Sequence, residues 1–267
     1  VTAPTSRAAR AAATPRTRLF YLETPTNPTL RLVDLPAAVR AAREVGAVTV
    51  LDHTFASPLG QDAPACGIDL VVHSCTKYMG GHGDLLAGSV SGTKERVTAA
   101  RALHAVLGPV CDPQTAWLLA RGLKTLPLRM ERHHRNGLAL ARFLEGRPQV
   151  RRVHHPFLES HPQHQLAREQ LSGGGGVLSF ELEDMAAARR FVKALRLIAW
   201  APSLGSVESL AHVPADRGGS HGHWSAEERA RSGVVDGLVR ISVGVEEEDD
   251  LLADCAQALE AMDGGMR

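Results

Sequence analysis

The stretch AVTVLDHTFASPLGQDAPACGIDLVVHSCTK, residues 47–77, decides the fold class. It contains two short apolar runs, residues 47–51 and 68–72, of the kind expected of parallel strands buried on both faces. Asp52 directly follows the first run, and Lys77 follows the second after a short polar segment. Because such runs alternate with helical patterns along the chain, we predict an α/β fold with a mostly parallel sheet and flanking helices.

The segments on either side continue this alternation. Residues 18–22 form an apolar run that ends at a proline-rich turn, and residues 85–91 form a further strand candidate. Between the first two strands, Asp34 and Pro36 open a predicted helix with an apolar stripe, and Gly46 ends it. The first half of the chain is therefore predicted to contain strands joined by helices.

Polar residues follow three of these predicted strands. Asn27 lies in the turn after the first, Asp52 follows the second, and Lys77 comes after the third. In sheets of this kind the ligand crevice lies outside the carboxyl ends of the strands. We therefore expect Asn27, Asp52 and Lys77 to converge there.

The second half of the chain has a different pattern. A helix is expected to open at Asp112 and Pro113, and a long helix is expected over residues 128–144. Short strand candidates then follow at residues 151–154, 177–182, 211–213 and 238–243. We predict a large domain over residues 1–140 and a smaller α+β domain over residues 141–267.

Composition excludes several classes of function. The 30 Lys and Arg residues balance 29 Asp and Glu residues, so no basic excess favours nucleic acid or an anionic membrane as a partner. The sequence has no long apolar stretch and no secretory signal, which predicts a cytoplasmic location. Its four cysteines form no C-x-x-C pair, and its 13 histidines have no metal-ligand spacing, so neither disulfides nor a metal site are predicted.

The residues around Lys77 suit one particular cofactor. Pyridoxal phosphate uses a lysine amine for a Schiff base and a carboxylate that keeps its ring nitrogen protonated, roles that Lys77 and Asp52 can fill. The hydroxyl groups of Ser74 and Thr76 can donate hydrogen bonds to a phosphate. From the local pattern alone, the alternative that Lys77 is a solvated surface residue stays open.

Several separated motifs resemble the Cys/Met metabolism family of pyridoxal-phosphate enzymes, which includes cystathionine gamma-synthase, cystathionine gamma-lyase and methionine gamma-lyase. They are YLETPTNPTL (21–30), LDHTFASP (51–58), HSCTKYMGGHGD (73–84), RGLKTL (121–126), SLGSVESL (203–210) and LVRISVGVE (238–246). The resemblance extends from about residue 15 to residue 260. It implies the fold type I of pyridoxal-phosphate transferases, a small amino-acid substrate, and a homo-oligomer, most simply a tetramer.

The resemblance also implies roles for the residues at the cofactor. Lys77 would carry the cofactor and then move protons, and Asp52 would pair with the ring nitrogen. Ser74 and Thr76 match phosphate ligands of the family. Asn27 matches the residue that hydrogen-bonds the 3-hydroxyl oxygen of the cofactor, although it could also serve only as a turn residue before Pro28.

The resemblance also implies that Arg240 binds the carboxylate of the substrate and that Ser203 assists it. Both have simpler alternatives: Ser203 as a turn residue, and Arg240 as a strand residue with an exposed head. Residues 201–202 are Ala-Pro, whereas family members that handle cystathionine often have Glu before this serine. The Ser-Leu-Gly sequence at 203–205 is similar to the gamma enzymes. The implied activity is γ-elimination or γ-replacement on sulfur amino acids or O-substituted homoserine.

Family members begin well upstream of Val1, so the resemblance implies a large domain that lacks its N-terminal part. This leaves two alternatives. One is an inactive or incomplete fragment that acts only with a complementary chain. The other is a fold type I aminotransferase, which needs the same lysine and aspartate.

Overall fold

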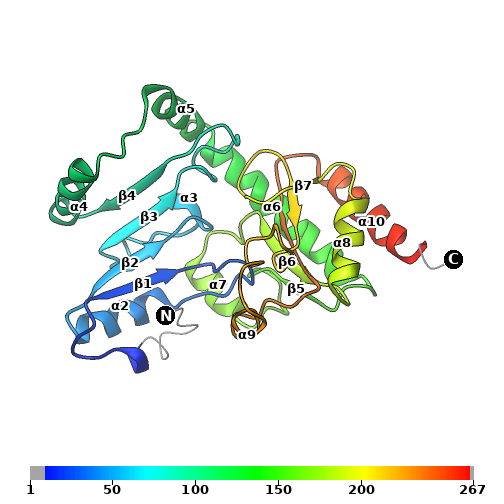
Figure 1. The fold of residues 1–267 in the computed structure, drawn as a ribbon, viewed down its shortest axis with the longest axis horizontal. Helices are drawn as coiled ribbons and strands as arrows, with labels where there is room; N and C mark the ends of the chain where they lie inside the picture. Colours follow the sequence, from blue (N-terminus) through cyan, green and yellow to red (C-terminus); the bar gives the residue numbers. More distant parts are fainter. Residues whose placement is uncertain (1–9, 265–267) are drawn as a thin grey trace. The chain divides into compact units, whose positions relative to one another are not determined.

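The computed structural model describes residues 10–264, which belong to two compact units (Figure 1). The first unit comprises Val1–Thr26, Arg31–Leu126 and Gln165–Ser172. The second comprises Asn27–Leu30, Pro127–His164 and Gly173–Arg267. The long segment of the first unit thus ends at Leu126, and the second unit resumes at Pro127. The domain division after residue 140 stays a prediction.

The first unit is built on a four-stranded sheet in the order β1-β2-β3-β4 (Figure 1). Three strands are parallel and β4 is antiparallel, so the predicted mostly parallel sheet is confirmed. The strands are β1 (Leu19–Glu23), β2 (Val48–Asp52), β3 (Leu70–Ser74) and β4 (Gly88–Gly92). The helices are α2 (Leu35–Glu44), α3 (Ser57–Gly60), α4 (Lys94–Leu107), α5 (Pro113–Leu123) and α7 (His164–Gln170), of which α7 begins one residue before this unit's last segment.

Helix α2 begins where the sequence predicts. The Asp34 carboxylate accepts a hydrogen bond from the backbone N–H of Ala37 at 2.9 Å, which satisfies one of the donors left unpaired at a helix start. Gly46 follows the helix with φ of 69°, a left-handed conformation that glycine adopts without strain. Helix α5 begins in the same way, since Asp112 accepts from the backbone N–H of Thr115 at 3.0 Å.

Only one face of the parallel strands is closely packed. In β2, Thr49 and Leu51 are buried, while the three residues between and beside them are partly exposed. The buried face packs against α2, in a cluster that comprises Leu22, Val33, Leu35, Ala38, Val39, Leu51, Ala63, Ile68 and Val71. The prediction that β2 is buried on both faces is therefore wrong: within residues 10–264, a helix layer packs tightly on one face only.

The second unit contains a five-stranded sheet in the order β5-β6-β9-β8-β7. All neighbouring pairs are antiparallel except β7 and β8. The strands are β5 (Arg152–His154), β6 (Val177–Glu181), β7 (Ala199–Trp200), β8 (Leu210–His212) and β9 (Leu238–Ser242), and the helices are α6 (Leu126–Glu145), α8 (Met185–Ala194), α9 (Ala226–Arg231) and α10 (Glu248–Gly264). This sheet with its helices has the α+β character expected of the second half.

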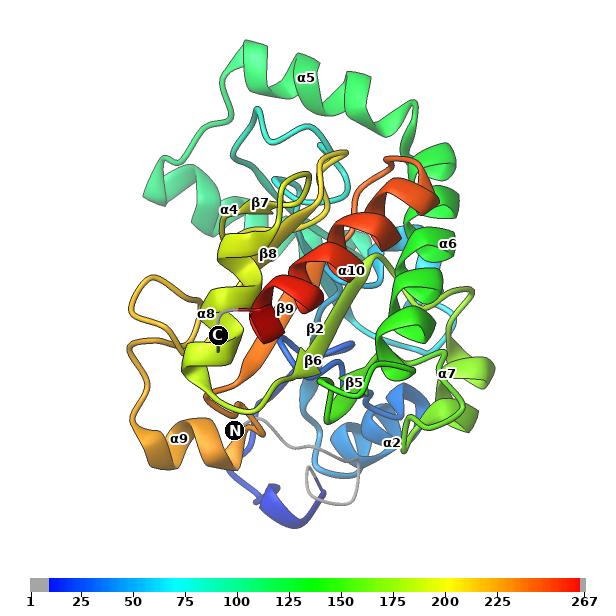
Figure 2. The ribbon, with the colours of Figure 1, turned by 90° about the vertical axis from the view of Figure 1, so that its right-hand side faces the viewer.

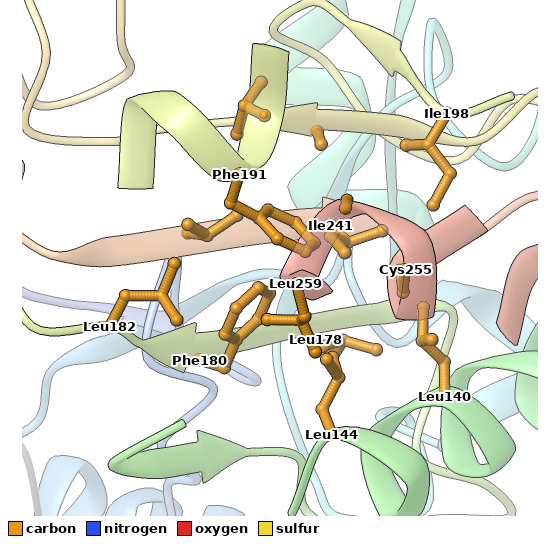
Figure 3. Packing of buried hydrophobic residues seen from close by; sticks show 14 of the residues in the cluster. Leu140, Leu144, Leu178, Phe180, Leu182, Phe191, Ile198, Ile241, Cys255 and Leu259 are labelled. Carbon is orange, nitrogen blue, oxygen red and sulfur yellow. The ribbon is translucent and has the colours of Figure 1, made fainter. Parts of the chain in front are cut away.

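Helices α6, α8 and α10 cover one face of this sheet, as Figure 2 shows for α10 in front of β6 and β9. Leu178 and Phe180 of β6 and Ile241 of β9 point into the same core (Figure 3). The rings of Phe180 and Phe191 meet edge to face, with centroids 5.2 Å apart. Because side chains alternate along a strand, the residues between these apolar ones lie on the opposite face.

All four cysteines are free. Among the described residues, no helix is both long and apolar enough to cross a lipid bilayer.

Candidate active site

Lys77 lies in a turn directly after β3. Its backbone N–H donates to the carbonyl of Ser74 at 3.1 Å, and its carbonyl accepts from the N–H of Gly81 at 2.8 Å. Asp52 is the last residue of β2, the parallel neighbour of β3, and pairs in register with Val72. The structure thus brings Asp52 and Lys77 to the carboxyl ends of adjacent strands, as the sequence predicts.

The turn that carries Lys77 is tight and depends on glycine. The N–H of Gly80 donates to the carbonyl of Cys75 at 2.8 Å. A Cβ at Gly80 would lie 2.9 Å from that same carbonyl oxygen, which is closer than packed atoms approach. Gly81 has φ of 76°, which any other residue adopts only with strain. These restraints hold the backbone of Lys77 in one conformation.

The surroundings of Asp52 are acidic. Glu23 lies opposite Asp52 in the register of β1 and β2, so both carboxylates lie on the same face of the sheet. Partial burial, together with Asp52 and Glu23, raises the pKa of Tyr21 above its usual value. Asp52 also accepts a hydrogen bond from the backbone N–H of Thr54 at 3.0 Å. This edge of the sheet therefore favours a cationic group.

Two buried histidines lie near the ends of β2 and β3. The rings of His53 and His73 are 5.5 Å apart, and Nε2 of His53 is 3.1 Å from Oε1 of Gln61. Burial lowers the pKa of His53 to about 4, although the Gln61 hydrogen bond opposes this. Burial also lowers the pKa of His73. Both imidazoles are neutral at pH 7, so they bring no positive charge to Asp52.

Ser74 and Thr76 flank the start of the turn. The backbone N–H of Ser74 donates to Oγ1 of Thr54 at 2.9 Å. The hydroxyl of Thr76 accepts from the N–H of Ala87 at 3.1 Å and donates to its carbonyl at 3.4 Å, which ties the turn to the segment before β4. Thr76 thus has a structural contact that the sequence did not indicate, and the phosphate-binding roles of both residues stay predictions.

The remaining three predicted residues, Asn27, Ser203 and Arg240, belong to the second unit. Arg240 lies on the central strand β9, and its Nη1 donates to Oδ1 of Asn27 at 2.8 Å. Its Nη2 donates to the carbonyl oxygen of Ser203 at 2.7 Å. The structure therefore brings these three residues together. With only 3% of Arg240 exposed, the alternative of an exposed arginine head is wrong.

Ser203 has φ of 106°, a left-handed conformation that is strained for any residue except glycine. The loop that follows it is anchored to the sheet. The N–H of Gly205 donates to Oγ of Ser242 at 2.9 Å. The N–H and hydroxyl of Ser209 both donate to the Glu246 carboxylate, at 2.6 and 2.8 Å. These contacts hold the Ser203 carbonyl where Arg240 binds it.

The sequence did not single out three residues beside Arg240. His212 lies opposite Arg240 in the register of β8 and β9. Its Nε2 is 3.2 Å from Oγ of Ser220, which is 2.8 Å from Nδ1 of His221. His221 lies close to His223 in the sequence, but this pair has no metal-ligand spacing and therefore predicts no metal site. Among the described residues, no group of three or more His, Cys, Asp or Glu is placed to hold a metal ion.

Comparisons with known proteins agree with the resemblance seen in the sequence. A family model for Cys/Met metabolism PLP-dependent enzymes matches residues 2–260. L-methionine gamma-lyase of Pseudomonas putida is 48% identical over 258 residues, which cover 96% of this chain and 64% of that protein. The chloroplastic cystathionine gamma-synthase 1 of Nicotiana tabacum is 46% identical over 248 residues, covering 92% of this chain and 46% of that protein.

The fold comparison gives the same result. The crystal structure of cystathionine gamma-lyase from Lactobacillus plantarum, complexed with L-serine, superposes with a TM-score of 0.92 and 38% sequence identity. The match covers 96% of this chain and 67% of that one. The chain thus spans less than two thirds of the length of the two curated relatives above.

Proposed function

Because the chain belongs to the family of Cys/Met metabolism PLP-dependent enzymes, we propose that it binds pyridoxal 5′-phosphate at Lys77 and acts on sulfur amino acids or O-substituted homoserine. The proposed reaction is γ-elimination or γ-replacement, that is, carbon-sulfur lyase or transsulfuration chemistry. One observation carries the proposal. Lys77 lies in a glycine-dependent turn after β3, next to the parallel strand that ends at Asp52.

The residues present fit this cofactor. Asp52 and Glu23 make one edge of the sheet acidic, which suits a protonated ring nitrogen. Ser74 supplies a hydroxyl group for the phosphate, and Thr76 supplies a second one if its proton turns away from the Ala87 carbonyl. Asn27 supplies an amide for the 3-hydroxyl oxygen. When bound, pyridoxal phosphate supplies an electron sink that stabilises negative charge on the carbon beside the substrate amine.

Lys77 has two tasks in this proposal. Its amine first anchors the cofactor, and it then acts as the base that takes the proton from the α carbon of the substrate. Departure of a γ substituent also requires loss of a proton from the β carbon. The flexible four-carbon side chain would let the same amine serve there, once it has passed the α proton on to the bound substrate–cofactor adduct and is again unprotonated. Asp52 would supply the carboxylate that pairs with a protonated ring nitrogen.

Arg240 is the residue that we propose binds the substrate carboxylate. A guanidinium can bind a carboxylate through two parallel N–H groups, which fixes orientation as well as position. Its hydrogen bonds to Asn27 and to the carbonyl of Ser203 restrict its motion before any substrate arrives. The binding energy of the carboxylate can then orient the bond that breaks.

Covalent attachment at Lys77 is directly testable. The purified chain is incubated with pyridoxal phosphate, reduced with borohydride, digested and examined by mass spectrometry. We expect one cofactor per chain, on the peptide that contains Lys77, and none in Lys77→Ala. Lys94→Ala is the matched control, because this lysine is exposed at the start of α4, and it should leave the labelling intact.

Two results would contradict the proposal. One is a parent chain that takes up no cofactor. The other is label that persists in Lys77→Ala or spreads over surface lysines. Chain that is loaded with pyridoxal phosphate but not reduced would next be assayed with cystathionine, O-succinylhomoserine and methionine, and release of 2-oxobutyrate would identify γ-elimination.

We also propose that the chain forms a homo-oligomer. The surface of helix α4 supports this proposal, because no residue of the helix is buried. Leu103, Val106 and Leu107 follow helical spacing on one side of this helix and are 61%, 84% and 69% exposed. Contiguous apolar side chains of this kind are typical of protein interfaces. A second copy of this chain is the proposed partner.

A cytoplasmic location, with an amino acid rather than a nucleic acid as ligand, completes the proposal. The four free cysteines support the location, because unpaired thiols persist in reducing compartments. The formal net charge of +1 supports the choice of ligand, since binding to nucleic acid depends on a basic surface.

A further inference from the structure

Three polar residues form a row across the second sheet, on the face opposite its apolar core. Ser179 of β6 and His212 of β8 both lie opposite Arg240 of β9 in register. Residues opposite each other on antiparallel strands place their side chains on the same face of the sheet, as close neighbours. Ser179, His212 and Arg240 are 0%, 3% and 3% exposed. The Arg240 side chain is therefore flanked on both sides by buried polar groups.

Each side of the row holds a separate segment of chain. On one side, the hydroxyl of Ser179 donates to the carbonyl of Pro28 at 2.7 Å, and the preceding residue, Asn27, accepts from Arg240. On the other side, Nε2 of His212 is 3.2 Å from Oγ of Ser220, and this oxygen is 2.8 Å from Nδ1 of His221. The row thus connects Arg240 to two loops that the sequence places far apart.

The Ser220 hydroxyl lies between the imidazoles of His212 and His221, and this position determines which ring nitrogens carry a proton. The hydroxyl has one proton to donate, so it donates to one ring and accepts from an N–H of the other. Burial, with a further contribution from the Arg240 charge, lowers the pKa of His212 to about 3 and that of His221 to about 4. Both rings are neutral at pH 7, so Arg240 is the cation of this row.

We propose that His212, held by Ser220 and His221, is a positioning residue that sets the orientation of the Arg240 guanidinium for carboxylate binding. The hydrogen bond to Ser220 restricts rotation of the imidazole, and the imidazole closes the β8 side of Arg240 as Ser179 closes the β6 side. A smaller or apolar side chain at this position would let the guanidinium shift away from Asn27 and Ser203. This inference rests on the proposed function, in which Arg240 receives the substrate carboxylate.

The test compares two ligands that differ only in a carboxylate. The chain loaded with pyridoxal phosphate is titrated with L-norleucine and with n-pentylamine, its decarboxylated analogue, and binding is followed by the visible absorbance of the cofactor. For His212→Leu we expect roughly tenfold weaker binding of L-norleucine, the size typical of coupling between neighbouring residues, and unchanged binding of n-pentylamine. His212→Gln, which keeps a hydrogen-bonding group, should recover most of the affinity.

The matched control is His154→Gln. This buried histidine is on β5 of the same sheet, outside the row, where it bonds to Glu181 at 2.7 Å. It should leave the preference for L-norleucine over n-pentylamine unchanged. The inference is overturned if His212→Leu binds L-norleucine as the parent does, or if it loses affinity for both ligands equally.

A second measurement needs no cofactor. Nitrogen-15 NMR of the imidazole rings at pH 7 should show His212 and His221 each neutral and in a single tautomer. In Ser220→Ala both should become mixtures of tautomers, whereas unchanged spectra would overturn the inference. If the parent chain fails to label at Lys77, the proposed function fails, while this experiment still decides whether Ser220 holds His212 and His221.

Discussion

Three histidines of the second unit are buried and uncharged. Burial is the main cause that lowers the pKa of His133 to about 4, that of His155 to about 3 and that of His161 to about 4. His155 packs against Gly174, at a position where a side chain would collide with its ring. These three residues serve as packed interior groups of the second unit.

A pH dependence of stability follows for His155. The unfolded chain binds a proton at this residue below about pH 6.5, whereas the folded chain does not until near pH 3. The contribution of this neutral imidazole to the free energy of unfolding is therefore complete above pH 6.5. It is lost as the pH falls toward 3, because the unfolded chain then binds a proton that the folded chain does not. Between pH 5.5 and 4.5 the parent should lose about 1.4 kcal/mol of unfolding free energy per pH unit through this residue.

The measurement is urea unfolding of the parent and of His155→Gln across this pH range. The variant should show a slope that is shallower by about that amount, whatever its stability at neutral pH. His223→Gln, which changes an exposed histidine, should keep the slope of the parent. Equal slopes in the parent and in His155→Gln would show that the buried imidazole titrates alike in both states.

At the scale of elements, α5 packs directly on the turn that carries Lys77. A Cβ at Gly122 of α5 would lie 2.9 Å from the carbonyl oxygen of Met79 and would collide with the carbonyl of Gly80. Only glycine allows the helix to approach this backbone so closely. The glycine in the RGLKTL motif thus has a packing reason that its sequence alone did not reveal.

Gly122→Ala should therefore displace α5 from the turn. Alanine favours helix by about 1 kcal/mol, but the collision with rigid backbone outweighs this gain. We expect a net loss of about 2 kcal/mol in unfolding free energy, as is usual for overpacked sites, together with weaker labelling of Lys77 by the cofactor. Urea unfolding and the borohydride experiment measure the two effects.

Gly60→Ala is the control for this prediction. A Cβ at Gly60 would lie 3.6 Å from Cβ of Ala56, an ordinary contact, and Gly60 also belongs to a helix of the first unit. It should change both stability and labelling much less than Gly122→Ala. A Gly122→Ala variant as stable as the parent would show that α5 can move away at little cost.

At the scale of the whole molecule, the exposed surface from α4 to α5 is the one that we propose binds a second copy of this chain. Residues 101–114 are all exposed, and they include several apolar side chains besides those of α4. A second copy of this chain would remove these side chains from water, and each large apolar residue buried contributes about 1.5–3 kcal/mol. The expected assembly is a homo-oligomer at micromolar concentration.

The double variant Leu103→Glu with Leu107→Glu tests this assembly. Two charges buried without partners should weaken self-association by at least roughly a hundredfold, which analytical ultracentrifugation would detect as a shift to monomer. Ala105→Glu places the same charge on the other side of α4 and should sediment like the parent. A monomeric parent chain, or a double variant that still associates, would refute this interface.

The sequence by itself determined the features that depend on near neighbours. The apolar runs located β1, β2, β3, β6 and β9 to within a few residues, and the capping residues Asp34 and Asp112 located two helix starts. Asp52 and Lys77 were placed correctly because each lies at or just after the end of its strand. The alternation of apolar runs with helical patterns predicted the fold class. Asp52 and Lys77, together with the family resemblance, predicted the cofactor.

Only the tertiary structure decided the contacts that depend on register. Asn27 and Arg240 are 213 residues apart in the sequence, and His212 meets Arg240 only because β8 and β9 pair as they do. The antiparallel direction of β4 and the partly exposed face of β2 likewise depend on which segments pack together. Local patterns reflect the preferences of a few adjacent residues, whereas pairing between distant strands is selected by the burial of the whole sheet.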